Sequence, residues 1–233
     1  MPHIYQKRPD TRLQIIQLAA KLFTEEGYSN TSFSKIAKAL DLSTGNITFY
    51  FKSKEHLLAQ LVAELLDFQR LLIEQAADEG KSSLLAYCLE LTSIVAICEE
   101  DEPIRDFFTA SYISPLTLAL IRENDTEKTK EVFGQFRPDW TDAQWEATEN
   151  IVSGIEYATI MTQEKDTPLP MQIEWTLNAI MLLYGVPEEL RRMKIEKVLQ
   201  MDYRALGQRI LSEFKEYIEK VNEENLKKAI QKK

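Results

Sequence analysis

Apolar residues recur at helical spacing along almost the whole chain. One example is the set Phe33, Ile36, Ala37 and Leu40, whose three- and four-residue steps place side chains on one face of an α-helix. Alternating β-branched runs between turn residues, which would predict strands, are nearly absent. The pattern therefore predicts an all-α protein with short loops. The expected helices span residues 10–26, 33–40, 44–50, 54–79, 82–99, 103–113, 115–123, 126–136, 142–164, 169–184, 187–201 and 203–230.

Capping residues and prolines mark several of these helix starts. Thr141 and Gln144 have the spacing of a capping box, and Gly27 suits the left-handed position that ends a helix. A proline costs least at the start of a helix, because the missing N–H has no intrahelical partner there. Five prolines stand at such places, namely Pro103, Pro115, Pro138, Pro168 and Pro187.

The first sixty residues contain two short helices, 33–40 and 44–50, joined by about three residues. This is the geometry of a helix-turn-helix. Neither helix would be stable alone, so both need cover from the helices before and after them. Ile47 and Phe51 lie four residues apart and are expected to share the buried face of the second short helix. Thr31 or Ser32 can cap the first short helix, and Ser43 can cap the second.

The remaining arc of residues 44–50 carries small polar and aromatic side chains, which suit the major groove of DNA. An Asn side chain matches the paired polar edge of adenine, and Thr offers a methyl group to thymine and a hydroxyl to phosphate. Lysines and arginines at the rim would meet phosphates. Ser43 could equally serve only as a helix cap, and Lys52 and Lys54 could be solvent-exposed surface charges without a DNA contact. The candidate DNA-binding residues are Lys7, Arg8, Arg12, Ser32, Ser43, Thr44, Gly45, Asn46, Thr48, Phe49, Tyr50, Lys52 and Lys54.

Charge is distributed unevenly between this segment and the rest of the chain. The 233 residues carry a net charge of −9. Residues 1–60 hold eight Lys and Arg against five Asp and Glu, whereas the rest holds 20 against 32. A small basic segment on an acidic protein is compatible with nucleic-acid binding, although the excess is too modest to establish it.

Together these features resemble the N-terminal domain of the TetR family of transcriptional regulators. The resemblance covers roughly residues 10–60, through AAKLFTEEGYSNTS, IAKAL, LSTGNITFYF and KSKEHLL, with the helix-turn-helix at about 32–51. Two positions depart from the family pattern. Asp41 stands where glycine is common, and Asp tolerates left-handed backbone. Thr48 replaces a tyrosine, which puts a tyrosine–phosphate contact at that place in doubt.

The resemblance implies two domains, a DNA-binding domain at 1–53 and a helical ligand-binding and dimerisation domain at 54–233, joined by the long fourth helix. Two copies are needed physically, because a seven-residue helix spans only about 10 Å and meets few base pairs. Helices 142–164 and 169–184 are the candidate dimer interface, since both are apolar over more than one face. They could instead be internal core helices, and helix 203–230 is a rival for the interface.

Aromatic residues of the larger domain could line a pocket around one acidic side chain. A buried Glu facing aromatic rings would favour a cationic ligand, although a solvated or interfacial position for this Glu is the alternative that the sequence favours. The candidates are Tyr87, Phe107, Phe108, Tyr112, Glu156 and Tyr157.

Other chemistry has little support in the sequence. Cys88 and Cys98 are ten residues apart in one expected helix, too far for a disulfide, and are expected to be buried free thiols. With His3 and His56 as its histidines, the chain offers no His/Cys metal cluster, and we find no phosphate loop or nucleophile motif. We therefore expect neither an enzyme nor a cofactor. A long apolar run is also absent, which predicts a soluble, cytoplasmic protein.

The sequence-based hypothesis is a sequence-specific DNA-binding regulator that acts as a homodimer on a double-stranded operator. By resemblance it would be a repressor released by a small molecule, with the fourth helix transmitting the change. The alternative is an all-helical adaptor that binds other proteins, which would leave the polar face of residues 44–50 unexplained.

Overall fold

The computed structural model describes residues 11–78, 82–162 and 167–231, and within these ranges the chain forms helices and loops without strands. The prediction of an all-α fold is confirmed. The helices are α1 (Thr11–Glu25), α2 (Phe33–Ala39), α3 (Thr44–Tyr50), α4 (Lys54–Asp78), α5 (Ser83–Glu100), α6 (Glu102–Ile113), α7 (Pro115–Phe133), the 3-10 turn η1 (Gly134–Phe136), α8 (Asp142–Met161), α9 (Leu169–Leu183), α10 (Glu188–Leu199) and α11 (Tyr203–Gln231).

The expected helices agree with the structure except around residues 115–136. The two helices predicted at 115–123 and 126–136 are one helix, α7, followed by η1. The polar residues that suggested a break lie inside the helix, where Thr126 and Thr129 donate hydrogen bonds to carbonyls one turn earlier. Pro138 begins no helix, since α8 begins at Asp142 behind the predicted Thr141–Gln144 capping box.

The N-terminal helices share one hydrophobic core with parts of the larger domain. Ile16, Phe23, Ile36 and Ile47 are buried together with α4 residues such as Leu57. Phe107 of α6 and Phe214 of α11 belong to the same core. This core contains residues from both sides of the predicted domain boundary between residues 53 and 54, so the N-terminal helices do not bury it by themselves. The predicted division of the chain at this point stays a prediction.

A second core surrounds α5, which is buried on almost every side by α6, α7, α8, α9, α10 and α11. Cys88 and Cys98 lie in this core as free thiols, as predicted. Burial raises the pKa of Cys88 to about 12, so this thiol is unreactive at neutral pH.

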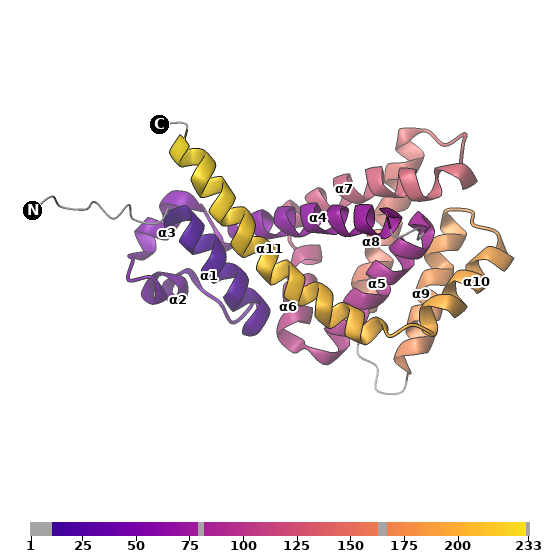
Figure 1. Cartoon of the computed structure of the whole chain (residues 1–233), viewed down its shortest axis with the longest axis horizontal. Helices are drawn as coiled ribbons and strands as arrows, with labels where there is room; N and C mark the ends of the chain where they lie inside the picture. The colour runs from indigo at the N-terminus through magenta and orange to yellow at the C-terminus, as the bar shows by residue number, and fades with distance from the viewer. Residues whose placement is uncertain (1–10, 79–81, 163–166, 232–233) are drawn as a thin grey trace, which may run out of the picture.

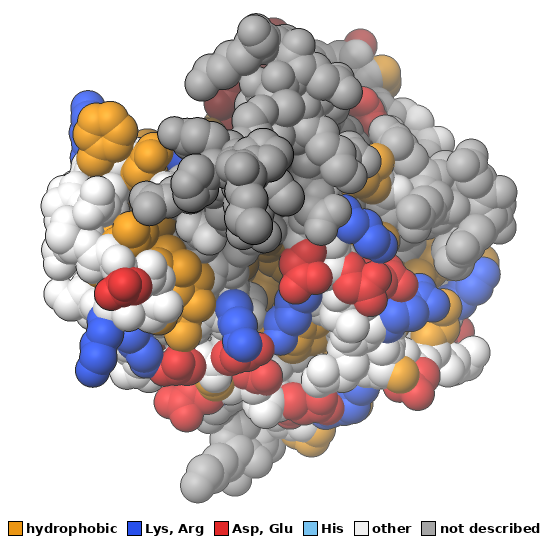
Figure 2. Space-filling view, turned by 60° about the vertical axis from the view of Figure 1, so that its left-hand side comes forward, with side chains coloured by type: hydrophobic (Ala, Val, Ile, Leu, Met, Phe, Trp, Pro, Cys, Tyr) orange, Lys and Arg blue, Asp and Glu red, His pale blue; other side chains and the backbone are white. Residues whose placement is uncertain are grey.

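Figure 1 shows the resulting arrangement, with α1, α2 and α3 at one end and α9 and α10 at the other. The helices α4 and α11 run between the two ends. In the part of the molecule visible in Figure 2, Lys and Arg side chains lie among Asp and Glu, without a broad patch of one sign on the described residues. None of the described helices combines the length and apolar character needed to span a membrane.

Candidate nucleic-acid interface and internal cavity

Two left-handed residues shape the turns around the helix-turn-helix. Gly27 has φ +92° after α1, and Asp41 has φ +54° between α2 and α3. Ser32, rather than Thr31, caps α2 by accepting a hydrogen bond from the backbone N–H of Lys35 at 3.2 Å. Thr31 is buried and donates its hydroxyl to the carbonyl of Gly27. Asp41 therefore fills the glycine position of the turn, as the sequence predicted.

The short helix α3 buries one side and exposes the other. Ile47 is fully buried and Phe51 nearly so, as their four-residue spacing predicted. The other residues from Ser43 to Tyr50 are exposed. Phe49 is 82% exposed and packs edge-to-face on Tyr50 at 5.1 Å. This exposed arc of α3, which we call the α3 face (residues 43, 44, 45, 46, 48, 49 and 50), is not covered by any of the described residues.

Hydrogen bonds within α3 already occupy some of the groups that were predicted to contact bases. The side-chain oxygen of Asn46 accepts hydrogen bonds from the backbone N–H of Ser43 at 3.2 Å and from its hydroxyl at 2.5 Å. Thr48 donates its hydroxyl to the carbonyl of Gly45 at 3.1 Å. A two-point contact of Asn46 with adenine would therefore require this cap to open, and the contact stays a prediction.

The predicted phosphate-binding cations differ in their surroundings. Lys52 is exposed. Arg12 donates to the side-chain oxygen of Gln60 at 2.7 Å and lies over the ring of Phe51. Lys7 and Arg8 lie outside the described residues.

Lys54 has a structural role that the sequence did not indicate. Its ammonium group donates to the backbone carbonyls of Tyr28 at 2.9 Å and Thr31 at 3.0 Å, and lies 3.9 Å from the Tyr28 ring centroid. Burial lowers the pKa of Lys54. The side chain thus holds the loop between α1 and α2, and its contact with phosphate stays a prediction.

The same loop is held from the other side by α6. Asp106 accepts hydrogen bonds from the backbone N–H of Ser29 at 2.6 Å and from its hydroxyl at 2.7 Å. Sequence reasoning missed this residue, because a partly buried Asp 77 positions away from Ser29 gives no local signal. The contact connects the loop before the helix-turn-helix directly to α6.

A cavity of about 260 Å³ lies where α1, α4, α5, α6 and α11 meet. Its walls are mainly apolar and include Phe107 and Phe108 from the predicted pocket set. Phe107 and Phe108 follow Asp106 in the same helix. The cavity wall therefore begins at the residue next to Asp106, which holds the α1–α2 loop.

A smaller cavity of about 40 Å³ contains most of the predicted pocket residues, namely Tyr87, Phe108, Tyr112 and Glu156. Tyr157 lines neither cavity and lies beside Tyr112 instead. The favoured expectation that Glu156 is solvated or interfacial is wrong. The side chain is 7% exposed, because α8 turns it inward between α5, α6 and α7.

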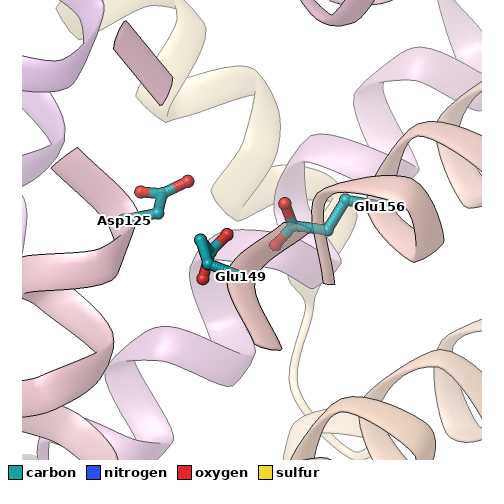
Figure 3. Close-up of side chains that lie close together, drawn as sticks. All are labelled: Asp125, Glu149 and Glu156. Atoms are coloured by element: carbon teal, nitrogen blue, oxygen red, sulfur yellow. The ribbon is translucent and has the colours of Figure 1, made fainter. Parts of the chain in front are cut away.

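Glu156 belongs to a buried group of three carboxylates. Asp125 of α7 and Glu149 of α8 each place an oxygen within 4.8 Å of the others (Figure 3). Burial, followed by the nearby Asp125, raises the pKa of Glu149 to about 7 and that of Glu156 well above its usual range. The sequence could have indicated this pair, since residues seven apart share a helix face.

Tyrosine hydroxyls and one lysine surround these carboxylates. Tyr87 and Tyr112 donate to the two oxygens of Glu156 at 3.4 and 3.0 Å, and Tyr184 donates to Glu149 at 2.8 Å. Lys128 forms an ion pair with Asp125 at 3.1 Å.

Comparison with known proteins gives matches concentrated in the N-terminal segment. The family profile described as "Bacterial regulatory proteins, tetR family" matches residues 15–61. The probable HTH-type transcriptional regulator YttP of Bacillus subtilis is 39% identical over 67 residues, 29% of this chain and 32% of that protein. The fatty acid metabolism regulator protein of the same organism is 44% identical over 59 residues, 25% of this chain and 30% of that protein.

The chain thus spans about a third of the length of the curated relatives that it matches. Among solved structures, CprB from Streptomyces coelicolor in complex with its operator is 21% identical, with a TM-score of 0.45. That alignment covers 87% of this chain and 96% of CprB. Residues 15–61, which contain the helix-turn-helix, are therefore similar to the N-terminal segment of the TetR family of bacterial regulatory proteins.

Proposed function

We propose that this protein is a sequence-specific DNA-binding transcriptional regulator, not an enzyme, and that it represses transcription until a small molecule releases it from its operator. The observation that carries the proposal is the α3 face. Ile47 and Phe51 hold α3 against the core, while its small polar and aromatic side chains stay exposed. The relatives that match this segment are named transcriptional regulators, which supports the same function.

The proposal requires a homodimer, for which α8 and α9 offer the best surface. The outer side of α8 exposes Ile151, Gly154, Ala158 and Met161, which recur at helical spacing. The outer side of α9 exposes Met171, Trp175 and Leu182 in the same way. The two helices pack on each other, so their exposed sides are neighbours. This surface supports the predicted interface over the rival α11.

A bound ligand would cause release from DNA by shifting α6. Phe107 and Phe108 line the larger cavity, and the adjacent Asp106 holds the loop before α2. A ligand that favours a shifted α6 would move this loop and change the spacing of the two α3 helices. Such a ligand shifts the equilibrium only by its difference in affinity between the two states. The predicted transmission through α4 would act in parallel, through Lys54.

Selection of bound duplexes from a random pool tests the function directly. We expect enrichment of a two-fold symmetric sequence whose half-sites lie about one helical turn apart, with affinity for it falling linearly on a log–log plot against salt. A chain that enriches no duplex, while it captures a helical partner without DNA, would instead be the adaptor.

A further inference from the structure

We propose that the two cavities together bind an amphiphilic organic cation, with its ammonium group against Glu156 and its hydrocarbon chain in the larger cavity. The inference rests on the proposed function only in assigning this ligand the role of effector. Its binding chemistry follows from the residues that line the cavities, whether or not the protein binds DNA.

The two cavities adjoin and differ in character. Both are lined by Leu65, Gln69, Glu90, Ile94 and Phe108, so they meet along one shared wall. The larger one is mainly apolar. Its wall also contains Ser93, which is 1% exposed and whose hydroxyl has no hydrogen-bond partner. An unpartnered buried hydroxyl is costly and suits a site that a ligand completes.

The smaller cavity is lined by more carboxyl groups than basic groups. Glu90, Asp125 and Glu156 line it, and Lys128 is its cation. Lys128 already forms ion pairs with Asp125 at 3.1 Å and Glu90 at 3.2 Å. Among the described residues, no ion pair joins Glu156 or Glu149 to a Lys or Arg. A positively charged ligand group would balance this excess.

A second observation points to a missing partner beside this cavity, since Glu149 lies next to its lining residues Asp125 and Glu156. One side-chain oxygen of Glu149 is buried without a hydrogen-bond partner, although Glu149 is only 1% exposed. Figure 3 shows the carboxylates of Asp125, Glu149 and Glu156 close together. Buried carboxylates normally find donors or cations, so this cluster is incomplete in the ligand-free protein.

The aromatic rings of the smaller cavity suit a quaternary or primary ammonium group. Tyr87, Phe108 and Tyr112 all line it. Ring faces attract cations within about 6 Å of the centroid. The ammonium of Lys128 lies 5.7 Å from the Tyr87 centroid, so this ring already accommodates one cation.

Anionic amphiphiles fit the same space poorly. A fatty carboxylate placed against Glu156 would form no ion pair with it and would lie near Asp125, while Lys128 is already paired. At the larger cavity, Arg209 forms an ion pair with Glu213 at 3.5 Å. The charge of the site therefore selects the head group, and the apolar wall selects a hydrocarbon chain.

Binding of a cation should also release a proton. Glu156 has a raised pKa and holds a proton in the empty cavity, because it is buried beside Asp125 and Glu149. A cation against it stabilises the carboxylate and lowers the pKa. The titratable groups around it are Tyr87 and Glu90 of α5, Tyr112 of α6, Asp125 and Lys128 of α7, Glu149 of α8, and Tyr184 directly after α9.

Calorimetry on the full chain without DNA tests the proposal, with three probes of equal chain length: decyltrimethylammonium, decanol and decanoate. We expect the cation to bind at least about tenfold more tightly than either other probe. Repeating the titration at pH 7 in buffers of different ionisation enthalpy should show proton release. Glu156→Gln should lose about tenfold in cation affinity and lose the proton release, whereas Glu146→Gln on the exposed side of α8 should change neither.

Three results would overturn the inference. Equal affinity for the three probes would show an apolar cavity without charge selection. Unchanged binding in a folded Glu156→Gln variant would place the ammonium elsewhere. Saturable binding of Mg²⁺ or Mn²⁺ that Glu156→Gln abolishes, without decyltrimethylammonium binding, would mean an inorganic cation site. Since none of these measurements uses DNA, failure here is distinct from failure of the proposed function, which the duplex selection measures.

Discussion

At the scale of single residues, the turn chemistry was predictable and the contacts between distant residues were not. Gly27, Asp41 and Ser43 follow from local rules on left-handed backbone and helix caps, and the structure agrees with each. Asp106 and Lys54 act on the α1–α2 loop from helices far away in the sequence. No local pattern could show that their partners are backbone groups of Tyr28, Ser29 and Thr31.

The two lysines at the start of α4, Lys52 before it and Lys54 as its first residue, should therefore behave differently when they are replaced. Lys52→Ala removes an exposed charge, so we expect weaker binding to every duplex and an unchanged melting temperature. The slope of log affinity against log salt concentration should become less steep by about one. Lys54→Ala leaves two backbone carbonyls without their donor and should lower the free energy of unfolding by about 1–3 kcal/mol as well. Denaturant unfolding and binding at several salt concentrations measure both effects. Equal stability of the two variants would contradict the role assigned to Lys54.

At the scale of helices, boundaries were predictable where caps or prolines mark them. The Thr141 capping box places the start of α8 correctly. The continuity of α7 was not predictable, because its buried polar residues, such as Asp125, look like a loop in the sequence. Their partner Lys128 lies one turn along the same helix, and the pairing becomes favourable only once α7 is packed against α5 and α8.

The crossing of α5 and α11 is another feature without a sequence signal. Gly207 lies in α11, and a Cβ there would lie 2.8 Å from the backbone oxygen of Ser93 and 2.6 Å from Ile97. Alanine normally improves a helix by up to about 1 kcal/mol over glycine. Here the backbone oxygen must move, so we expect Gly207→Ala to destabilise the protein by about 1–3 kcal/mol.

Gly134→Ala is the matched control for this crossing. Gly134 has helical φ and ψ angles, and nothing lies within 4 Å of an added Cβ. We expect this variant to be as stable as the parent or slightly more so. Thermal unfolding of both variants measures this difference in stability. A Gly207→Ala variant as stable as Gly134→Ala would show that α5 and α11 can separate at little cost.

At the scale of the whole molecule, two surfaces and the internal cavities follow one another along its length. The α3 face lies at one end, and the exposed sides of α8 and α9 lie farther along (Figure 1). Between them, α4, α5 and α6 line both cavities, together with α1 and α11 at the larger one and α7 and α8 at the smaller one. The sequence could predict the amphipathic α3 and the apolar α8 and α9. It could not show the cavities, because their walls combine side chains from five or more helices whose packing is not a local property.

The exposed sides of α8 and α9 lead to a prediction about the assembly. Trp175 is 68% exposed, and aromatic residues of this kind often supply much of the free energy of an interface. We expect Trp175→Asp to give a folded monomer at micromolar concentration, because an unpaired charge would be buried in the dimer. Operator affinity should then fall by about a hundredfold or more, since a single α3 meets only one half-site.

Met193→Asp is the control for this prediction, since Met193 is also exposed but lies on α10. That variant should remain dimeric and bind the operator like the parent. Sedimentation equilibrium measures the assembly, circular dichroism the fold, and titration with the selected duplex the affinity. If Trp175→Asp remains dimeric while a charge on the exposed side of α11 produces monomers, the interface belongs to α11. In that case the spacing of the two α3 helices would be set by the helix that also lines the larger cavity, and ligand binding would act on the dimer directly.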